Sequence, residues 1–242
     1  MIKRSVTTYK DLDFAAGQTI LFDKPLDLTS FDVVYRLRRI LHIQKIGHAG
    51  TLDPKATGLL IVCTGKSTKK IDSYMGLPKE YEGTMVFGEQ TPSMDSETEV
   101  FMKQDASSVT MEEIISAAGS LTGEIDQIPP MYSAVSKNGQ RLYSLARKGE
   151  TIEREPRRVV VEEFEILDYS PPVVKFRVLC SKGTYIRVLA HDMGQILGCG
   201  AWLSSLRRTA IGEFKVDDAV TIESFRDIYN SDKSETMIEN ES

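Results

Sequence analysis

Hydrophobic and polar positions along the first third of the chain predict a strand, a helix and a second strand. Residues 19–22 form a short apolar strand that ends in a polar turn at 23–25. Thr29 or Ser30 then caps a helix in which apolar residues recur every three to four positions. Residues 59–63 are continuously apolar, which is typical of a strand buried on both faces.

Further along, the pattern predicts a strand over 80–88, where apolar and polar residues alternate. Thr110 and Glu113 have the spacing of a capping box for a helix that runs through Ala118. Strands at 159–169 and 173–180 flank a Ser-Pro-Pro turn and predict a hairpin.

The last part of the chain predicts a helix up to residue 197, a late strand over 201–214 and a final helix over about 222–229. Residues 231–242 are polar and acidic, which predicts a frayed tail. Strands interrupted by helices, with long hairpins late in the chain, favour an α+β fold. The expected sheet is extended, mixed and mostly antiparallel.

Residues 128–150, read as IPPMYSAVSKNGQRLYSLARKGE, predict a separate surface segment. Two prolines stop the preceding element, residues 131–135 are expected to be extended, and 137–139 form a turn. Residues 140–148 then predict a short basic helix. Without further information, this is a hairpin and a helix on the surface.

The composition excludes several classes of protein. The chain has 242 residues, 41% of them hydrophobic, which is enough for a sizeable core. It has no apolar run of about 20 residues and its N-terminus lacks the apolar stretch of a signal peptide, so we expect a cytoplasmic protein with no membrane partner. Three cysteines and three histidines are widely scattered, which predicts reduced thiols and no metal site.

The net charge of −5 argues against a polyanionic partner until its distribution is considered. Residues 216–242 hold eight acidic and two basic residues, and the remainder is nearly neutral. Basic residues form four clusters: Arg36, Arg38, Arg39 and Lys45; Lys66, Lys69 and Lys70; Arg141, Arg147, Lys148, Arg154, Arg157 and Arg158; and Arg207 and Arg208. Each cluster alone is typical of a solvated face, and the alternative is that together they line one groove.

The stretch most informative about chemistry is 47–69, read as GHAGTLDPKATGLLIVCTGKSTK. Asp53 precedes Pro54, which pushes it out of the helical region and predicts that it stands at the head of a turn. Gly50 and Gly58 flank it and permit positive φ or close backbone packing. An Asp-Pro step is ordinarily a helix cap, but an acid on a rigid loop above a buried strand is also a suitable nucleophile.

This whole string resembles the active-site loop of the TruB family of tRNA pseudouridine synthases. The shared pattern is G-H-x-G-T-L-D-P-x-A-T-G-x-L, followed by G-x-x-T-K up to Lys69. The resemblance implies that Asp53 is the catalytic nucleophile and that His48 inserts into the tRNA loop. The preceding Asp-Lys-Pro step also fits the family, so Lys24 and Lys69 are expected to bind substrate.

Other segments extend the resemblance over roughly residues 19–225. The pattern K-x-Y followed by Gly88 implies that Tyr81 is an active-site residue, although a tyrosine in a strand is ordinarily a core residue. The string C-S-K-G-T-Y-I-R implies that Tyr185 lines the base pocket and that Arg187 pairs with the catalytic aspartate. The late strand is expected to close the pocket with Leu206.

The resemblance also implies what the whole protein does. It predicts the pseudouridine synthase fold with a central catalytic cleft, in a catalytic domain over 1–230 with a thumb-like RNA-binding insertion at about 128–155 that includes Arg141. The expected reaction is the isomerisation of uridine 55 in the tRNA T-loop after base flipping, without cofactor or metal. We expect a monomer that needs neither guide RNA nor a protein partner, with an acidic tail at 231–242 and no PUA domain.

Two other functions start from the same residues. A metal-dependent hydrolase could use Asp53 and His48, and insensitivity to chelators would exclude it. A simple RNA-binding module needs a basic surface but no isolated acid, because Asp53 in a phosphate-rich groove repels RNA. The discriminating observation is whether replacing Asp53 removes turnover while sparing binding.

Overall fold

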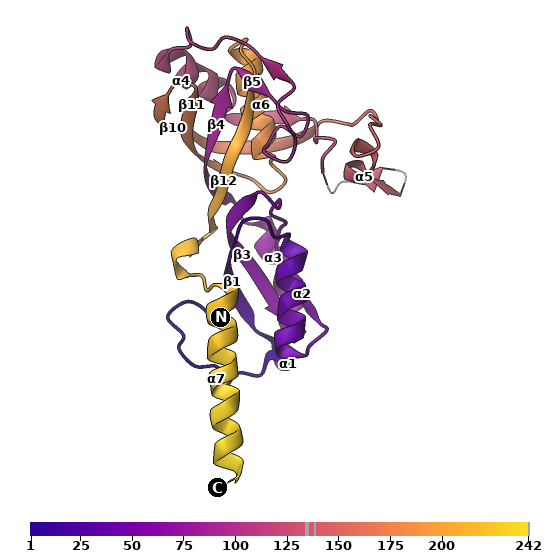
Figure 1. Cartoon of the computed structure of the whole chain (residues 1–242), viewed down its shortest axis with the longest axis vertical. Coiled ribbons are helices and arrows are strands. Elements are labelled where there is room, and N and C mark those ends of the chain that lie inside the picture. The colour runs from indigo at the N-terminus through magenta and orange to yellow at the C-terminus, as the bar shows by residue number, and fades with distance from the viewer. Residues whose placement is uncertain (134–135, 138, 242) are drawn as a thin grey trace. The chain divides into compact units, whose positions relative to one another are not determined.

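The computed structural model of the protein, drawn as a ribbon in Figure 1, describes residues 1–133, 136–137 and 139–241. The chain divides into two compact units, which we name unit 1 (Met1–Lys79 with Arg207–Ser242) and unit 2 (Glu80–Leu206). The expected catalytic domain over 1–230, its insertion and its tail stay predictions as domain boundaries.

Unit 1 is built around the strand pair formed by β1 and β3. Its elements are α1 (Phe14–Gly17), β1 (Thr19–Lys24), α2 (Ser30–Leu41), β2 (Ile46–His48), β3 (Ala56–Thr64), the 3₁₀ helix η1 (Gly65–Lys70), α3 (Ile71–Gly76), β13 (Phe214–Lys215), the 3₁₀ helix η2 (Val216–Asp218) and α7 (Ile222–Glu241). Strands β1 and β2 both pair antiparallel with β3, and β12 (Ala201–Ile211) is the next neighbour of β3.

Both faces of the β1–β3 pair are buried, as the apolar run over 59–63 predicts. Ile20 and Phe22 point to one face and pack with α1, α2 and α7. Leu21 and Ile61 point to the other face, where side chains of α3 cover them. This double burial fixes the register of β3. The register in turn fixes the position of the polar loop that precedes β3.

Helix α2 begins where its sequence signal predicts. The Thr29 side chain accepts a hydrogen bond from the Asp32 backbone N–H, while the Asp32 carboxylate accepts one from the Thr29 N–H, forming a capping box. The apolar face of the helix is buried, and the helix ends at His42, which has φ of +57°. The cap therefore fixes the start of α2, whose first residue, Ser30, is hydrogen-bonded to the loop that carries Asp53.

Unit 2 is a twisted sheet covered by helices. Its elements are β4 (Lys79–Phe87), β5 (Glu89–Gln90), β6 (Met102–Lys103), α4 (Met111–Ser120), β7 (Gly123–Gln127), β8 (Ser136–Lys137), β9 (Gln140–Arg141), α5 (Leu142–Ala146), β10 (Arg157–Ser170), β11 (Val173–Cys180) and α6 (Ile186–Ile196). The strand order is β12-β4-β11-β10-β7, with antiparallel pairing of β11, β10 and β7. The unit boundaries fall within β4, between Lys79 and Glu80, and within β12, between Leu206 and Arg207. The predicted α+β class with a mostly antiparallel sheet is confirmed.

Several predicted elements differ from the structure. The late strand expected over 201–214 ends at Ile211, because residues 212–213 form a turn and β13 pairs back onto β12. The expected basic helix over 140–148 is shorter, because Gln140–Arg141 forms β9 and pairs with β8 before α5 begins. Residues 134–135 of the expected extended run, and Asn138 of the expected turn, lie outside the described residues.

The final helix is longer than the pattern of apolar residues predicts. Helix α7 continues from Ile222 to Glu241, through most of the expected tail. Asp232 accepts hydrogen bonds from the Thr8 hydroxyl and the Tyr9 backbone N–H, and Glu235 pairs with Lys10 at 2.7 Å. These contacts with the N-terminal segment support the helix where its own apolar residues end.

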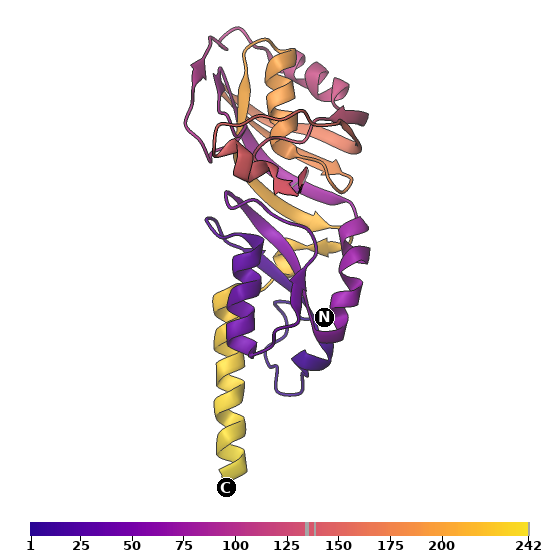
Figure 2. The ribbon, with the colours of Figure 1, turned by 90° about the vertical axis from the view of Figure 1, so that its right-hand side faces the viewer.

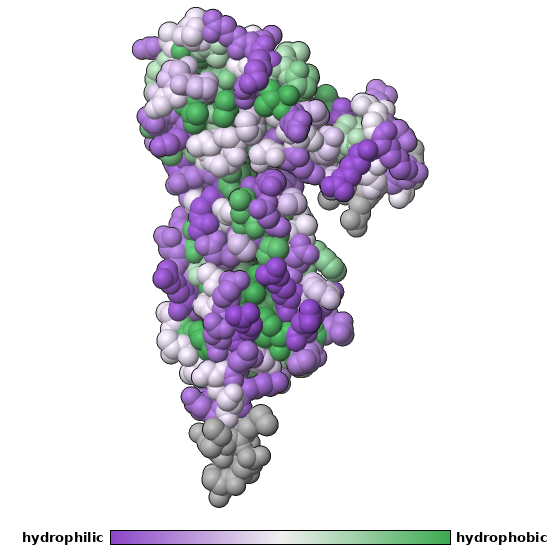
Figure 3. Space-filling model, in the orientation of Figure 1, coloured by the Kyte–Doolittle hydropathy of each residue, from purple (hydrophilic) through white to green (hydrophobic). Residues whose placement is uncertain are grey.

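On the face drawn in Figure 3, hydrophilic side chains cover most of the surface and apolar residues form small patches between them. Among the described residues, no helix is both long enough and apolar enough to span a bilayer.

Candidate active site

Asp53 stands at the first position of a β-turn between β2 and β3. The Ala56 backbone N–H donates to the Asp53 carbonyl at 3.0 Å, and Pro54 occupies the second position, where its fixed φ favours this turn. The Asp53 side chain belongs to a half-buried residue. The predicted place of Asp53, at the head of a turn that leads into a buried strand, is therefore the one observed.

The first anchor of this turn comes from α2. The Ser30 hydroxyl accepts a hydrogen bond from the Leu52 backbone N–H at 2.8 Å and donates to the Leu52 carbonyl at 3.2 Å. Both residues are buried. The backbone directly before Asp53 is thus joined to the first turn of a capped helix.

The second anchor is Arg208 on β12, whose residue is only 1% exposed. Its Nε donates to the Leu59 carbonyl at 2.7 Å, and its two terminal nitrogens donate to the carbonyls of Gly50 at 3.2 Å and Thr51 at 3.4 Å. One guanidinium therefore ties both ends of the Asp53 loop together. A charge this deeply buried is retained only when it is well hydrogen-bonded.

Glycine is required where the loop meets β12. Gly58 has φ of +104°, and a Cβ there would lie 2.3 Å from the Arg208 carbonyl oxygen. Gly50 has φ of +92°, a conformation that other residues rarely adopt. The expectation of positive φ at both positions is met, and the close approach brings Arg208 within reach of the loop carbonyls.

Lys24, at the end of β1, is fully buried and contacts backbone. Its Nζ donates to the carbonyls of Pro25 at 2.9 Å and Leu28 at 2.6 Å. Burial lowers the pKa of Lys24 from 10.5 to about 8, the Arg208 charge acts in the same direction, and the Asp53 carboxylate opposes them. Lys24 therefore lies within electrostatic range of Asp53 and keeps a positive charge at neutral pH.

His48 lies on β2, opposite Val62 of β3, and is half-buried. Burial lowers the pKa of its imidazole, the Arg208 charge lowers it further, and a hydrogen bond with the Gly50 backbone opposes both. The ring is consequently neutral at physiological pH. Unit 1 thus gathers Lys24, His48 and Asp53 around the guanidinium of Arg208.

Unit 2 has its own cluster around a buried arginine, Arg187, near the start of α6. Its guanidinium pairs with the Asp95 carboxylate at 3.4 Å, and both side chains are less than a tenth exposed. The same guanidinium lies 5.7 Å from the centre of the Tyr185 ring. Gln127 holds the Tyr185 backbone, accepting from its N–H at 2.9 Å and donating to its carbonyl at 3.3 Å. The pairing of Arg187 with Asp53 stays a prediction.

The other predicted residue in this unit's interior is Tyr81. It is 9% exposed, on the face of β4 that also buries Met85 and Phe87. The alternation that predicts this face is therefore observed, and the ring occupies a position typical of a core residue.

The comparisons with known proteins cover nearly the whole chain. The model of the TruB family pseudouridylate synthase N-terminal domain matches residues 38–186, and that of the tRNA pseudouridylate synthase B C-terminal domain matches residues 187–240. The chain belongs to the TruB family. The predicted pseudouridine synthase fold and family membership are thereby confirmed.

Its TruB relatives are similar over most of their own length. The tRNA pseudouridine synthase B of Parabacteroides distasonis is 48% identical, with 89% of this chain and 94% of the relative covered. The tRNA pseudouridine synthase B of Flavobacterium johnsoniae is 47% identical, and the match covers 89% of this chain and 97% of the relative. The chain is thus a member of the tRNA pseudouridine synthase B family, whose activity is the pseudouridylation of tRNA.

Solved structures give the same fold. A chain of a Cbf5–Nop10–Gar1 complex is 33% identical with a TM-score of 0.74, and the match covers 94% of this chain and 58% of that one. A second match is a chain of an H/ACA RNP bound to a substrate RNA containing 2′-deoxyuridine. It is 30% identical with a TM-score of 0.69, and the match covers 92% of this chain and 56% of that one. The TruB chain spans a little over half the length of these solved chains.

Three predicted TruB site residues remain to be placed. Lys69 is exposed on η1, and Leu206 is half-buried on β12, the last residue of unit 2. Arg141 lies on β9, and its side chain is outside the described residues. The substrate-binding roles of all three stay predictions.

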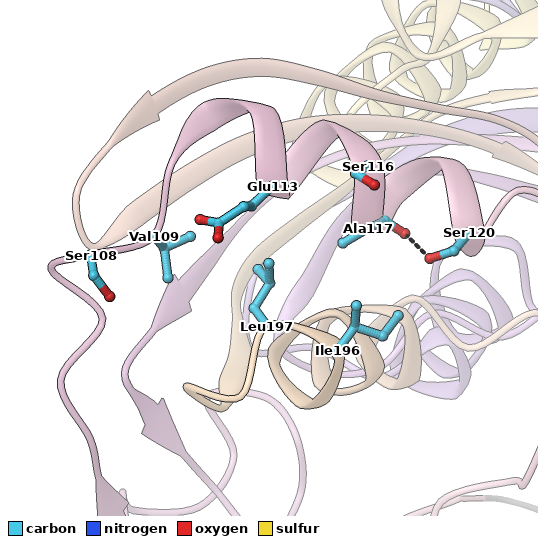
Figure 4. A pocket seen from close by; sticks show the side chains of 8 residues that line it. All are labelled: Ser108, Val109, Glu113, Ser116, Ala117, Ser120, Ile196 and Leu197. Atoms are coloured by element: carbon cyan, nitrogen blue, oxygen red, sulfur yellow. Dashed lines mark hydrogen bonds between the residues drawn. The ribbon is translucent and has the colours of Figure 1, made fainter.

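A cavity of about 340 Å³ lies elsewhere in unit 2, between α4 and α6 (Figure 4). It is lined by Ser108, Val109, Glu113, Ser116, Ala117, Ser120, Ile196 and Leu197. Its polar groups serve the helix: Glu113 completes the capping box with Thr110, and the Ser120 hydroxyl donates to the Ala117 carbonyl. No predicted TruB site residue lines this cavity. In the described part of the chain, no three His, Cys, Asp or Glu residues form a metal-binding group.

Sequence analysis does not identify two residues that support these clusters, Asp95 in unit 2 and Arg208 in unit 1. Asp95 lies in a polar and acidic segment, and its one signal is the alternation of Thr91, Ser93 and Asp95. The hydroxyls of Thr91 and Ser93 both donate to the Asp95 carbonyl. Arg208 was grouped with surface cations, and its burial has no local signal because its acceptors are about 150 residues away in the chain.

Proposed function

We propose that this TruB protein converts uridine 55 in the T-loop of tRNA to pseudouridine, with Asp53 as the nucleophile. The observation that carries the proposal is the construction of the Asp53 loop. A half-buried carboxylate stands on a backbone held by Ser30 and Arg208, and the charge of Lys24 lies within electrostatic range. A nucleophile on a preorganised support, with positive charge nearby, is what this reaction requires.

The reaction balances without a cofactor. The C1′–N1 bond of the uridine breaks, the detached uracil turns, C5 bonds to C1′, and the proton on C5 is lost while N1 gains one. Asp53 starts the reaction either by attack at C1′ or by a route through a glycal. Both routes need an ionised carboxylate, which the positive charge of Lys24 favours.

In this proposal, Arg187 pairs with Asp53, and Asp95 positions Arg187. Its support is the buried Arg187–Asp95 pair, because a guanidinium carries five N–H donors and can bind more than one carboxylate. Tyr81 stacks on the uracil and takes part in proton removal, and Tyr185 lines the base pocket beside Arg187.

The target base must leave its stack, at a cost of a few kcal/mol. His48 would fill the vacated place in the T-loop, since the ring precedes the nucleophile by five residues on the same loop. The lowered pKa of His48 supports a stacking role in the neutral form rather than acid–base work. Lys69 and Arg141 would contact phosphates of the T-arm.

We further propose that the chain acts on tRNA without guide RNA or protein partner. The relatives that it matches over most of their length carry the name tRNA pseudouridine synthase B. The solved chains from H/ACA complexes are larger, and this chain matches a little over half of each.

The test uses unmodified tRNA transcripts tritiated at uracil C5 and the purified chain alone. We expect tritium release and a single pseudouridine at position 55, located by carbodiimide-dependent primer extension. A transcript with cytidine at 55 should release no tritium above background. Tritium release in excess EDTA would exclude a metal-dependent hydrolase. In this assay the tRNA is folded in monovalent salt and polyamine, so that its structure does not depend on divalent cations. Pseudouridine at another position, or none, would overturn the proposal.

A further inference from the structure

Unit 1 contains a second concave surface, a groove of about 520 Å³ between α2 and α7, which lie side by side in Figure 2. It is lined by Arg36, Arg39, Ile40, His42, Ile222, Glu223, Arg226 and Asn230. None of these residues belongs to the site around Asp53. We refer to this surface as the α2–α7 groove.

The groove carries positive charge that is only partly compensated. Arg36 and Arg39 are exposed, three residues apart on one face of α2, and neither makes an ion pair in the part of the chain that the structure describes. By contrast, Lys3, Lys10 and Lys55 of the same unit each pair with a carboxylate at 2.7–2.8 Å. Within an acidic protein, free arginines around a hollow are typical of a site for phosphate groups.

Helix α7 separates its charges between two sides. Arg226 and Asn230 line the groove, whereas Asp232 and Glu235 contact the N-terminal segment at Thr8, Tyr9 and Lys10. Those two carboxylates are therefore engaged away from the groove. The acids that remain close are Glu223, which lines it, Asp227, which pairs with Arg226 at 3.1 Å, and Asp32 of α2, whose carboxylate interacts electrostatically with Arg36.

Aromatic rings accompany the arginines along α2. Phe31 is 58% exposed and Tyr35 is 51% exposed, one helical turn apart. The Arg38 guanidinium lies over the Phe31 ring, 5.6 Å from its centre. Exposed aromatic side chains among arginines are characteristic of RNA-binding surfaces, because bases stack on the rings while cations contact the phosphates.

Helix α2 connects this surface to the nucleophile. Ser30, its first residue, holds the backbone next to Asp53. At a rise of 1.5 Å per residue, Arg36 and Arg39 lie about 9 Å and about 14 Å along the helix axis from Ser30. An RNA whose base reaches Asp53 can therefore run its backbone along the same helix.

We propose that the α2–α7 groove binds the phosphate backbone of the same tRNA whose uridine enters the Asp53 site. The inference rests on the proposed function for the identity of the RNA. Arg36 and Arg39 each take one phosphate contact, Arg226 supplies further positive charge, and Tyr35 offers a stacking surface. The groove grips the substrate and takes no part in bond breaking.

The test is the double variant Arg36→Gln with Arg39→Gln, compared with Arg4→Gln with Lys215→Gln. The control pair removes the same charge from two exposed positions of unit 1 that do not line the groove. Filter binding of tRNA from 50 to 200 mM salt measures Kd and its salt dependence. Circular dichroism checks that both double variants are folded.

Each lost phosphate contact lowers the salt slope by about 0.9. For the groove variant, the rise in Kd between 50 and 200 mM salt should be smaller than for the wild type by about tenfold. Kd at 50 mM salt should increase, and in turnover assays the loss should fall mainly on KM rather than on kcat. The control pair should keep the wild-type slope and activity.

Equal salt slopes in the two double variants would overturn the inference, and so would a groove variant that loses kcat while its Kd stays at the wild-type value. Such a failure is distinct from failure of the proposed function, because the wild-type chain would still form pseudouridine at position 55. If the wild type forms none, the proposed function fails, whereas the binding measurements still decide whether the groove holds RNA.

Discussion

The Asp53 loop and the insertion at 128–155 differ in how their backbones are held. The Asp53 loop has two buried anchors, Ser30 and Arg208, which contact backbone groups on both sides of the acid. In its described residues, this predicted insertion has a β8–β9 ladder of two residue pairs, one short helix, and a hydrogen bond from the Arg154 guanidinium to the Pro129 carbonyl at 3.2 Å. The Arg147 guanidinium of the insertion reaches a carboxylate only at 3.6 Å, with a largely exposed side chain.

This difference matches the demands of the role that we propose for each region. A carboxylate that attacks a sugar carbon must be positioned to a fraction of an ångström, so its support is buried and hydrogen-bonded. A segment that grips and releases RNA needs charge and adjustability, and a few exposed contacts suffice. Substitutions in the loop should therefore affect turnover, and substitutions in the insertion should affect binding.

The largest effect is expected at the nucleophile. Asp53→Asn should eliminate pseudouridine formation while tRNA affinity stays within about tenfold, because the amide removes the covalent step and not the grip. Asp27→Asn is the matched control, since it replaces a neighbouring carboxylate. The Asp27 backbone N–H donates to the Pro54 carbonyl, and the Asp27 side chain pairs with Lys55. Tritium release and filter binding measure both quantities. Substantial turnover by Asp53→Asn would exclude the assigned role.

The second prediction concerns Arg208, a positioning residue. Arg208→Lys keeps the charge but cannot reach all three carbonyls, so kcat should fall by about 100-fold, the loss expected for a displacement near 1 Å. The Kd for tRNA should change little. Arg207→Lys is the control, because Arg207 pairs with the Asp23 side chain at 2.7 Å instead. If Arg208→Lys turns over at the wild-type rate, the loop does not need this anchor.

Arg208→Met tests the same residue through stability. It leaves the carbonyls of Gly50, Thr51 and Leu59 without their donor, at about 1–3 kcal/mol for each group that stays buried and unsatisfied. Urea unfolding should show this loss. A stability equal to the wild type would mean that water or another donor replaces the guanidinium.

In the insertion, neutralising Arg141, Arg147 and Lys148 together should weaken tRNA binding. The salt slope should flatten by up to about three phosphate contacts, and bound tRNA should still react. Arg147 also stacks on Tyr143 with its guanidinium 4.3 Å from the ring centre, so circular dichroism should confirm that α5 is retained. An unchanged slope would place this segment away from the RNA.

The smallest effect is a pH dependence from His48. Because burial and Arg208 lower the pKa of His48 in the folded chain, the unfolded chain takes up the proton first as the pH falls. The resulting stability is present above the ordinary pKa of 6.5 and is lost as the pH falls through the folded pKa. Urea unfolding of the wild type and His48→Gln between pH 7.5 and 5 should show a steeper loss in the wild type. Parallel curves would contradict this cause.

Local signals predicted much of the fold. The capping box of Thr110 and Glu113 and the positive φ of Gly50 and Gly58 depend on neighbouring residues, and each is observed. The end of α7 could not be predicted in this way, because Asp232 is held by residues more than 220 positions earlier.

The site follows the same rule. The place of Asp53 at the head of a turn follows from the adjacent proline and was predictable. The burial of Arg208 depends on acceptors about 150 residues away in the chain, and Arg187 pairs with Asp95 across 92 residues. Neither contact could be predicted from the spacing of residues in the sequence. Buried polar groups are matched in three dimensions, so their partners become visible only in the fold.

The hydrogen bonds from Arg208 go to main-chain oxygens and not to side chains, so the loop can accept a new side chain at Thr51 without losing its anchor. Thr51 is exposed, while Cys63, Cys180 and Cys199 are all buried and form no disulfide. Thr51→Cys would therefore offer the one thiol in reach of a maleimide dye, two residues from Asp53. A fluorophore at this position would report the binding and release of tRNA in real time. Because Arg208 anchors the loop backbone, a change in fluorescence would be caused by RNA binding and not by motion of the loop.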